Sequence, residues 1–385
     1  MRFALSTEQL DFAAELRKIL DAGQVPAAVR AWGAGDSAAG RALLRQIADM
    51  GVFGLIVDEQ YGGAEATAVD LVVAAIELGR AAVPGPVIES IAVIPALLQR
   101  LPEAGPAARW LPALASGDLL GTVAFEGPGR ALALDADVAD LVLIAGRDRV
   151  AAIESASTGA SPGHESSSAP GDGPARPSTT ALLDGSRHFE ADHPHRRDAT
   201  VLAGPISSID PARKLFPVIS EQVVAEGVSV DYAFDVGVLA CAAQLLGAGR
   251  ALLDQSVAYA KQRRQFGRAI GEFQVVKQQL ADVRIGLDLA EPLVYRAALT
   301  LESDDRARDV SAALVACGDA AHRAARAGLQ VHGAIGYTAE CDLSLLLTRV
   351  AALRTAWGTA DFHRGRIAAT LRATALGAAV TDTAS

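Results

Sequence analysis

Five consecutive residues in the second half of the chain offer the most direct chemistry in the sequence: Arg263, Arg264, Gln265, Phe266 and Gly267. Guanidinium groups can bind a diphosphate through paired hydrogen bonds, and an aromatic ring can cover a flat ligand ring. The residue types therefore fit a ligand that joins phosphates to a planar ring. A solvated basic corner with one buried phenylalanine fits the same composition, so the residues alone leave both interpretations open.

A long predicted helix must position these residues. Apolar side chains recur every three or four residues, which places one stripe of the helix against a core; they are Val238, Leu239, Ala242, Leu245, Leu246, Leu252, Leu253 and Val257. Glycine tolerates the left-handed backbone of a helix C-terminus, so we expect this helix to end near Gly267. A second helix is expected to start around Glu272. The five residues would then lie at a corner between two helices.

Two blocks of this half resemble signatures of the acyl-CoA dehydrogenase family. Residues 259–274 are similar to the pattern Y-x-x-x-R-x-Q-F-G-x-x-I-x-x-F-Q, and residues 330–338 are similar to Q-x-x-G-x-x-G-Y-T. Residues 47–63 resemble a stretch of the family's N-terminal domain, with Asp58 at the position of the family's proline. Residues 124–130 resemble the flavin-contacting loop T-E-P-x-A-G-S-D but lack its Ser-Asp portion.

The resemblance implies FAD as the cofactor. It implies that Arg263 and Gln265 hold the diphosphate, that Phe273 and Gln274 lie against the adenosine half, and that residues 330–334 contact the cofactor from a neighbouring subunit. The full implied set is Arg263, Gln265, Phe266, Phe273, Gln274, Gln330, Val331, His332, Gly333, Ala334, Thr359 and Asp361. Close helix packing is the competing role for Gly333, and helix capping is the competing role for Thr359.

The catalytic base of the family has no counterpart at the expected positions. Acyl-CoA dehydrogenases remove the α-proton of a thioester with a carboxylate, and the β-hydride passes to the flavin. The resemblance places that glutamate directly before a Gly-Thr pair, where this chain has Trp357. Two further positions used within the family correspond to Gly237 and Gln244. All three positions therefore lack an acid.

Asp235 is the acid nearest to these positions in the sequence. It follows Phe234, and the pair resembles the family's substrate-contacting Phe-Asp dipeptide. Asp235 is therefore the candidate base, and Phe234 and Asp235 are candidate substrate contacts. Capping of the helix N-terminus is the competing role for Asp235.

The predicted elements divide the chain into three parts. Residues 1–118 have helical spacing. Residues 119–225 contain short β-prone runs at 120–124, 141–145, 150–153, 200–203 and 223–225. Residues 226–385 return to long helices, expected at about 235–264, 272–300, 307–333, 340–356 and 360–376. The expected fold is mostly α with a central β domain, comprising an N-terminal helical domain, a small β-barrel-like middle domain and a C-terminal four-helix bundle. Residues 155–180 are rich in Ser, Gly and Pro and are expected to form a flexible surface insertion without chemistry.

Composition narrows the class of protein. A net charge of −10 argues against a nucleic-acid partner. No run of about 18 uninterrupted apolar residues occurs, so no membrane span is expected. The N-terminus is predicted to be an amphipathic helix capped by Ser6 or Thr7. The three dispersed cysteines, Cys241, Cys317 and Cys341, are expected to be reduced, buried thiols of a cytoplasmic protein. No metal site is expected from these cysteines or from the histidine cluster His188, His193 and His195.

Three hypotheses remain open. The first is the base-less subunit of a hetero-oligomer, in which a homologous subunit supplies the carboxylate, as in actinobacterial relatives acting on sterol side chains. The second is a self-sufficient FAD-dependent dehydrogenase with a displaced base, assembled as a homo-oligomer. The third is a helical scaffold without a ligand. Either enzyme would act on an acyl-CoA from fatty acid or sterol side-chain degradation and pass electrons to an electron transfer flavoprotein.

Overall fold

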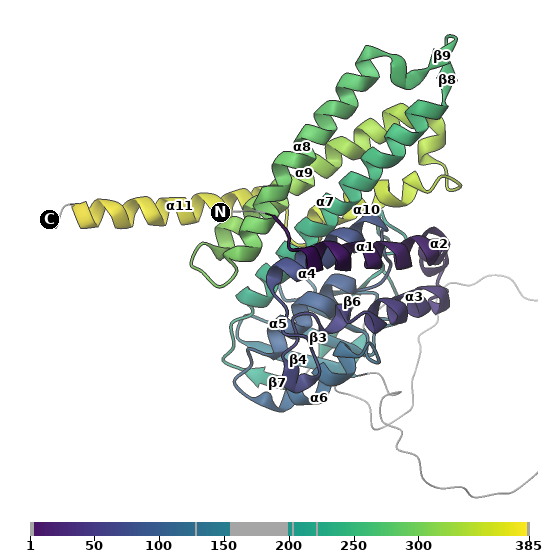
Figure 1. Cartoon of the computed structure of the whole chain (residues 1–385). Helices are drawn as coiled ribbons and strands as arrows, with labels where there is room; N and C mark the ends of the chain where they lie inside the picture. Colours follow the sequence, from purple (N-terminus) through teal and green to yellow (C-terminus); the bar gives the residue numbers. More distant parts are fainter. Residues whose placement is uncertain (1–3, 128, 155–198, 202–203, 221, 383–385) are drawn as a thin grey trace, which may run out of the picture.

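The computed structural model describes residues 4–127, 129–154, 199–201, 204–220 and 222–382 (Figure 1). The insertion expected at residues 155–180 and the three histidines at 188, 193 and 195 lie outside these residues. Helices occupy the first part of the chain, short strands follow, and long helices complete it. The prediction of a mostly helical fold with a central β region is confirmed.

Six α-helices form the first part: α1 (Thr7–Ala22), α2 (Val25–Gly33), α3 (Ala38–Asp49), α4 (Ala68–Arg80), α5 (Ile94–Leu98) and α6 (Ala104–Ala115). The predicted cap at Ser6 is confirmed, because its hydroxyl accepts from the backbone N–H of Gln9 at 3.2 Å. The Gln9 side chain in turn accepts from the backbone N–H of Ser6, which completes a capping box. A π-helical turn, Glu89–Val93, leads directly into α5.

Two small sheets form the middle of the chain. The strands are β1 (Gly121–Phe125), β2 (Leu132–Leu134), β3 (Leu141–Ala145), β4 (Arg149–Glu154), β5 (Ala199–Val201), β6 (Leu215–Ser220) and β7 (Val223–Glu226). One sheet has the order β1-β3-β4-β7 and the other β2-β6-β5, and only the β1–β3 pair is parallel. Small and β-branched side chains such as Ala124, Ile144 and Val218 fill a separate hydrophobic cluster here.

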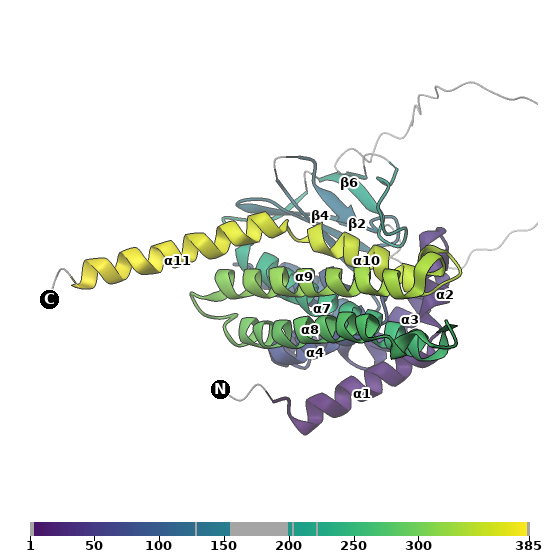
Figure 2. The ribbon, with the colours of Figure 1, turned by 90° about the horizontal axis from the view of Figure 1, so that it is seen from above.

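Long helices dominate the rest of the chain: α7 (Asp231–Gln262), α8 (Gln274–Leu299), α9 (Arg306–His332), α10 (Leu343–Ala356) and α11 (Ala360–Asp382). Figure 2 shows α7, α8 and α9 side by side, with α11 running out beyond the other helices. Each of the five predicted C-terminal helices is present. Their observed ends differ from the predicted ones by a few residues.

Helix α7 is the centre of the molecule. It packs against α4, α8, α9 and α10, and its small residues allow this. A Cβ on Gly79 of α4 would overlap the backbone of Gln244, and a Cβ on Gly247 would overlap the carbonyl oxygen of Ile76. By length and composition α7 is apolar enough to cross a membrane, but its most apolar window is 94% buried inside the protein. Its apolarity is therefore explained by its place in the core.

The corner after α7 differs from the predicted helix end at Gly267. Helix α7 stops at Gln262, and a short hairpin follows, with β8 (Arg264–Gln265) pairing with β9 (Arg268–Ala269). Phe266 and Gly267 form its turn with φ of 52° and 82°. Two consecutive positive φ values are typical of the type I′ turn, which matches the twist of the strands in a two-residue hairpin. Because this hairpin starts at Arg264, helix α7 ends before Gly267.

Candidate active site

An aromatic cluster joins three distant parts of the chain. Phe125 at the end of β1, Phe234 near the start of α7, and Trp357 after α10 meet with ring-centroid distances between 5.5 and 5.9 Å. Phe362 at the start of α11 contacts the edge of this group, with its ring centroid 6.2 Å from that of Phe234. Trp357 is only 5% exposed. The cluster is therefore a largely apolar wall where the β region meets the helices.

Trp357 fills the space at two of the positions where an acid was sought. A Cβ added to Gly237 would lie 2.5 Å from Cζ3 of Trp357, so the indole packs directly on the glycine backbone. The two positions are thus in contact, although they are 120 residues apart (357 − 237). Gln244, the third position, lies elsewhere on α7, at its close approach to α4. No side chain that could accept a proton from carbon occupies either of the first two positions.

A chain of hydrogen bonds fixes the turn that carries the indole. The imidazole Nε2 of His363 lies 2.8 Å from the carbonyl oxygen of Trp357, and its Nδ1 lies 3.0 Å from the hydroxyl of Ser311. A carbonyl oxygen only accepts, so Nε2 carries the hydrogen and Nδ1 accepts. Burial lowers the pKa of His363, which favours this neutral form. Ser311 also accepts from Arg366 at 3.2 Å.

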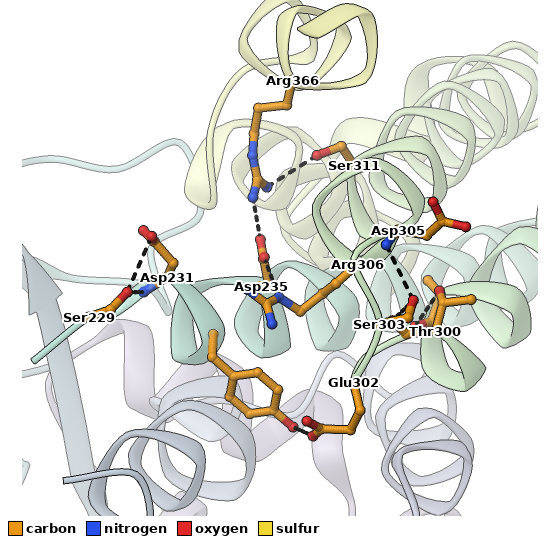
Figure 3. A network of polar contacts seen from close by, with 12 residues as sticks. Ser229, Asp231, Asp235, Thr300, Glu302, Ser303, Asp305, Arg306, Ser311 and Arg366 are labelled. Carbon is orange, nitrogen blue, oxygen red and sulfur yellow. Dashed lines mark hydrogen bonds and ion pairs between the residues drawn. The ribbon is translucent and has the colours of Figure 1, made fainter. Parts of the chain in front are cut away.

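Asp235 lies at the other end of this chain of contacts (Figure 3). Its side chain is buried, and its two oxygens accept from Arg306 at 2.9 Å and from Arg366 at 2.6 Å. The carboxylate thereby ties α7 to α9 and α11. The predicted capping role is wrong, because α7 starts at Asp231, where the backbone N–H bonds to the Ser229 hydroxyl at 3.4 Å. Asp235 therefore lies inside the helix.

A cavity of about 510 Å³ opens beside the aromatic cluster. Helix α10 and strands of both sheets line it, and most of its walls are apolar or aromatic. Two buried ionisable side chains, Glu89 and Arg213, also face it. Neither residue is predicted from the sequence. A signal was available for Glu89, because it is a single acid within the apolar run 87–98.

The predicted diphosphate-binding residues gather at the far end of α7. Arg263, Gln265 and Phe266 lie at the hairpin tip, and Phe273 and Gln274 begin α8. The Phe266 ring is 91% exposed. Within the described ranges, Arg263, Arg264 and Arg268 form no ion pair. Exposed and uncompensated guanidinium groups beside an exposed ring fit an anionic, planar group such as the diphosphate and ring of FAD.

The second predicted segment lies next to this tip. Gln330, Val331 and His332 end α9, and the His332 ring stacks on Tyr259 of α7 with centroids 4.3 Å apart. Gly333 has φ 64° and ψ −144°, a conformation open to glycine, and Ala334 follows it. The structure therefore brings residues 330–334 beside the last turn of α7.

Thr359 and Asp361 lie far from the hairpin tip. They follow Trp357 at the start of α11, where the Thr359 hydroxyl accepts from the backbone N–H of Phe362 at 3.2 Å. Trp357 contacts the beginning of α7, whereas the tip follows its end. At about 1.5 Å per residue, the separation along α7 is roughly 40 Å. One dinucleotide does not span this distance, so both groups can contact one cofactor only if a second chain brings them together.

Comparisons with known proteins identify the family of this chain. The model "Acyl-CoA dehydrogenase, N-terminal domain" matches residues 6–118, and "Acyl-CoA dehydrogenase, C-terminal domain" matches residues 227–372. The chain is 29% identical over 326 residues to acyl-CoA dehydrogenase IpdE2 of Mycobacterium tuberculosis, covering 84% of this chain and 85% of that protein.

Solved structures share the whole fold. The ChsE4–ChsE5 complex of Mycobacterium tuberculosis matches with a TM-score of 0.74 and 20% identity, over 97% of this chain and 99% of that one. Butyryl-CoA dehydrogenase of Megasphaera elsdenii matches with a TM-score of 0.73 and 18% identity, over 96% and 100%. Matched at both ends and throughout its fold, the chain belongs to the acyl-CoA dehydrogenase family of FAD-dependent flavoproteins.

Proposed function

We propose that this chain is the base-less subunit of a hetero-oligomeric acyl-CoA dehydrogenase that forms an α,β double bond in an acyl-CoA thioester. The contact between Trp357 and Gly237 carries this proposal. An indole cannot accept a proton from carbon, and its packing on the glycine leaves no room there for a carboxylate. A companion chain of the same family would supply the glutamate.

In a subunit without the base, the aromatic residues around Trp357 would still shape the ligand site. Phe125, Phe234 and Trp357 form an apolar wall that excludes water from the adjoining cavity. Bound FAD would supply the hydride acceptor. Loss of a general base typically costs about 10²–10⁴ in rate, so this chain's own site would turn over slowly or not at all.

The hairpin tip would serve the cofactor of a neighbouring chain. Arg263 and Gln265 would bind its diphosphate, Phe266, Phe273 and Gln274 would lie against its adenosine half, and residues 330–334 would contact it beside them. Thr359 and Asp361 would contact the cofactor held at the aromatic wall. The exposure of the tip and the roughly 40 Å separation support this division, because each group needs another chain to complete a site.

Relatives support the kind of partner and substrate. The ChsE4–ChsE5 structure is described as a complex of two chains, and another structural neighbour is described as an electron transferring flavoprotein. We infer a homologous dehydrogenase subunit as the partner and an electron transfer flavoprotein as the electron acceptor. A bulky acyl-CoA from sterol side-chain or fatty acid degradation is the inferred substrate. The thiols of Cys241, Cys317 and Cys341 are free, in keeping with a cytoplasmic location.

A self-sufficient dehydrogenase is the second candidate, and Asp235 would be its base. One observation favours it: the carboxylate is buried next to Phe234, which belongs to the aromatic wall. The two arginines that bind its oxygens weigh against it, because both carboxylate oxygens already accept hydrogen bonds within the chain.

Visible spectra separate these functions. The chain would be expressed alone and with homologous dehydrogenase chains encoded beside it, and each preparation would be titrated with acyl-CoA thioesters. We expect yellow colour and bleaching by substrate only in the co-expressed complex, and loss of bleaching when the companion's glutamate is changed to glutamine. Bleaching of the chain alone, abolished by Asp235→Asn, would establish the self-sufficient enzyme. A stable chain that stays colourless with every companion would indicate a scaffold.

A further inference from the structure

Glu89 is a buried acid that the dehydrogenase chemistry described above does not use. It opens the π-helical turn before α5, is 4% exposed, and faces the cavity of about 510 Å³ beside the aromatic wall. Its Oε2 has no hydrogen-bond partner. Buried polar atoms are nearly always hydrogen-bonded, because leaving one without a partner destabilises the folded protein. The carboxyl is therefore arranged for a partner that the chain itself does not provide.

Arg213 faces the same cavity from the segment before β6. It is 7% exposed, and within the described ranges it forms no ion pair. A second buried arginine, Arg349, shows the usual arrangement, because it binds Asp210 at 2.6 Å and donates to the carbonyl oxygen of Val83 at 2.7 Å. Arg213 is thus the cavity's buried cation, and its N–H donors are available to a ligand.

The two groups form a set of donors. Burial raises the pKa of Glu89, against the opposing effect of the charges on Arg213 and Arg349. This shifts the carboxyl towards its neutral form, whose O–H can donate. Arg213 stays protonated and presents a planar fork of N–H groups. A guanidinium and a carboxyl O–H lining one cavity fit a ligand oxygen that is negatively charged or strongly electron-rich.

Most of the remaining lining is apolar, and its other polar residues are Arg130, Ser208 and Thr355. Leu132, Leu134 and Leu215 come from the strands, and Phe125 and Trp357 come from the aromatic wall. A pocket with apolar walls and a small number of polar groups at one end binds a mainly apolar ligand and orients it by its polar atoms. The position of the polar groups therefore carries information about the ligand's chemistry.

We propose that Arg213 and Glu89 form an oxygen-binding end of this cavity, which holds a carboxylate or carbonyl group of the bound ligand. This chemistry has two sources in a flavin-dependent dehydrogenase, namely an oxygen function on the acyl group of the thioester or the carbonyl oxygens of the flavin ring. The inference rests on the proposed function only in taking the cavity to be the ligand site. It needs no turnover by the chain.

The test measures binding rather than activity. Two acyl-CoA thioesters of equal length, one ending in a carboxylate and one in a methyl group, would be titrated calorimetrically into the full chain with its co-purified companion. FAD affinity would be measured on the same preparations. We expect Arg213→Leu and Glu89→Leu each to lower the affinity for the ligand whose oxygen binds there by about 10- to 100-fold. This is the range for a hydrogen bond to a charged group. Glu89→Gln keeps a neutral donor and is expected to stay within about threefold of the wild type.

The pattern of losses identifies the oxygen. Loss of the preference for the carboxylate thioester, with unchanged FAD affinity, places the acyl group's oxygen at the pair. A loss of FAD affinity in both variants, with the relative affinity for the two thioesters unchanged, places the flavin ring there. Arg109→Leu is the matched control, since Arg109 is an exposed cation that does not line this cavity. Folded Arg213→Leu and Glu89→Leu proteins that keep both affinities within twofold would overturn the proposal, and Glu89→Leu alone gives the same test if Arg213→Leu does not fold.

Discussion

Trp357 matters for stability as well as for the absence of a base. Its indole is buried, packs on Gly237, and contacts Phe125 and Phe234. Replacing a buried tryptophan by alanine leaves a cavity, and such changes cost about 3–5 kcal/mol. We expect Trp357→Ala to lower the free energy of unfolding by this amount in urea denaturation.

Phe362→Ala is the control for this substitution. Phe362 belongs to the same cluster but is 49% exposed, and its contact with the wall is an edge contact with Phe234. We expect it to cost about 1 kcal/mol or less, because little apolar area is uncovered. An equal cost for both variants would mean that the indole is not the residue that holds the wall together.

Asp135 predicts a pH dependence of stability. It is buried, has φ 50°, and accepts from the backbone N–H of Lys214 at 3.0 Å. Burial raises its pKa from 3.8 to about 7. Between these values the folded chain binds more protons than the unfolded chain, so the free energy of unfolding falls as pH rises from about 4 to about 7. Above about pH 7 this contribution to the free energy of unfolding is fully lost. The size of the pKa shift of Asp135 makes the loss roughly 4 kcal/mol.

Asp135→Asn removes this titration and keeps a side chain that tolerates positive φ. We expect the variant and the wild type to unfold at similar urea concentrations at pH 4, and the variant to be the more stable at pH 8. Asp137→Asn is the control, because this partly exposed carboxylate pairs with Lys214 at 2.6 Å and is not buried like Asp135. A stability difference that does not change with pH would contradict the assignment.

At the scale of elements, Asp235 connects α11 to the body of the protein. Arg366 is the α11 residue that binds it, and Arg306 adds the contact from α9 (Figure 3). Asp235→Asn would leave two partly buried guanidinium groups without their anion. Removing one partner of such a pair costs about 2–4 kcal/mol when the charges keep some access to water. Backbone amides of α11 should then exchange hydrogen faster, while those of α8 keep their rates.

Asp361→Asn gives the comparison within the same helix. Its carboxylate is 94% exposed and binds Arg364 at 3.1 Å. Exposed ion pairs contribute about 1 kcal/mol or less, so exchange in α11 should hardly change. If Asp235→Asn also left α11 unchanged, the hydrogen-bonded chain through Ser311 and His363 would be sufficient to hold that helix.

Long helices could be predicted from the sequence, whereas the hairpin and two strands could not. Helical periodicity located the five C-terminal helices, because each buries one stripe and spacing reports burial directly. The hairpin after α7 was missed, since the left-handed backbone at Phe266 is not a preference of that residue type. Strand β2 was missed because three residues carry too little pattern, and β6 because Pro217 argues against a strand.

In the site, too, features that are local in sequence could be predicted and long-range contacts could not. Family signatures marked the hairpin tip and the Trp357 position, since both are local in sequence. The contact of Trp357 with Gly237 and the pairing of Asp235 with Arg366 join residues more than 100 positions apart. Glu89 and Arg213 share a cavity for the same reason. Neither spacing nor composition reports such contacts, because they depend on how α7 packs against the rest of the chain.

At the scale of the whole molecule, the proposed function requires another chain, and α8 offers a surface for it. Val275, Ile285 and Leu289 are 73%, 55% and 71% exposed, and Leu293 is 38% exposed. The last three are four residues apart, so they form one stripe, next to a groove of about 710 Å³ between α8 and α9. Exposed apolar stripes of this kind mark interaction surfaces.

Leu289→Glu tests that surface. A charge in the middle of the stripe would be buried without a partner in an assembly but would meet only water in the separate chain. We therefore expect the variant to elute at a smaller mass in size-exclusion chromatography with light scattering and to lose bound flavin. Its melting temperature as a separate chain should stay within a few degrees of the wild type. Leu10→Glu on α1, 55% exposed in the wild type, is the matched control and should change neither property. An unchanged mass and flavin content for Leu289→Glu would mean that the companion chain docks elsewhere, and the hairpin tip with its exposed Phe266 would be tested next.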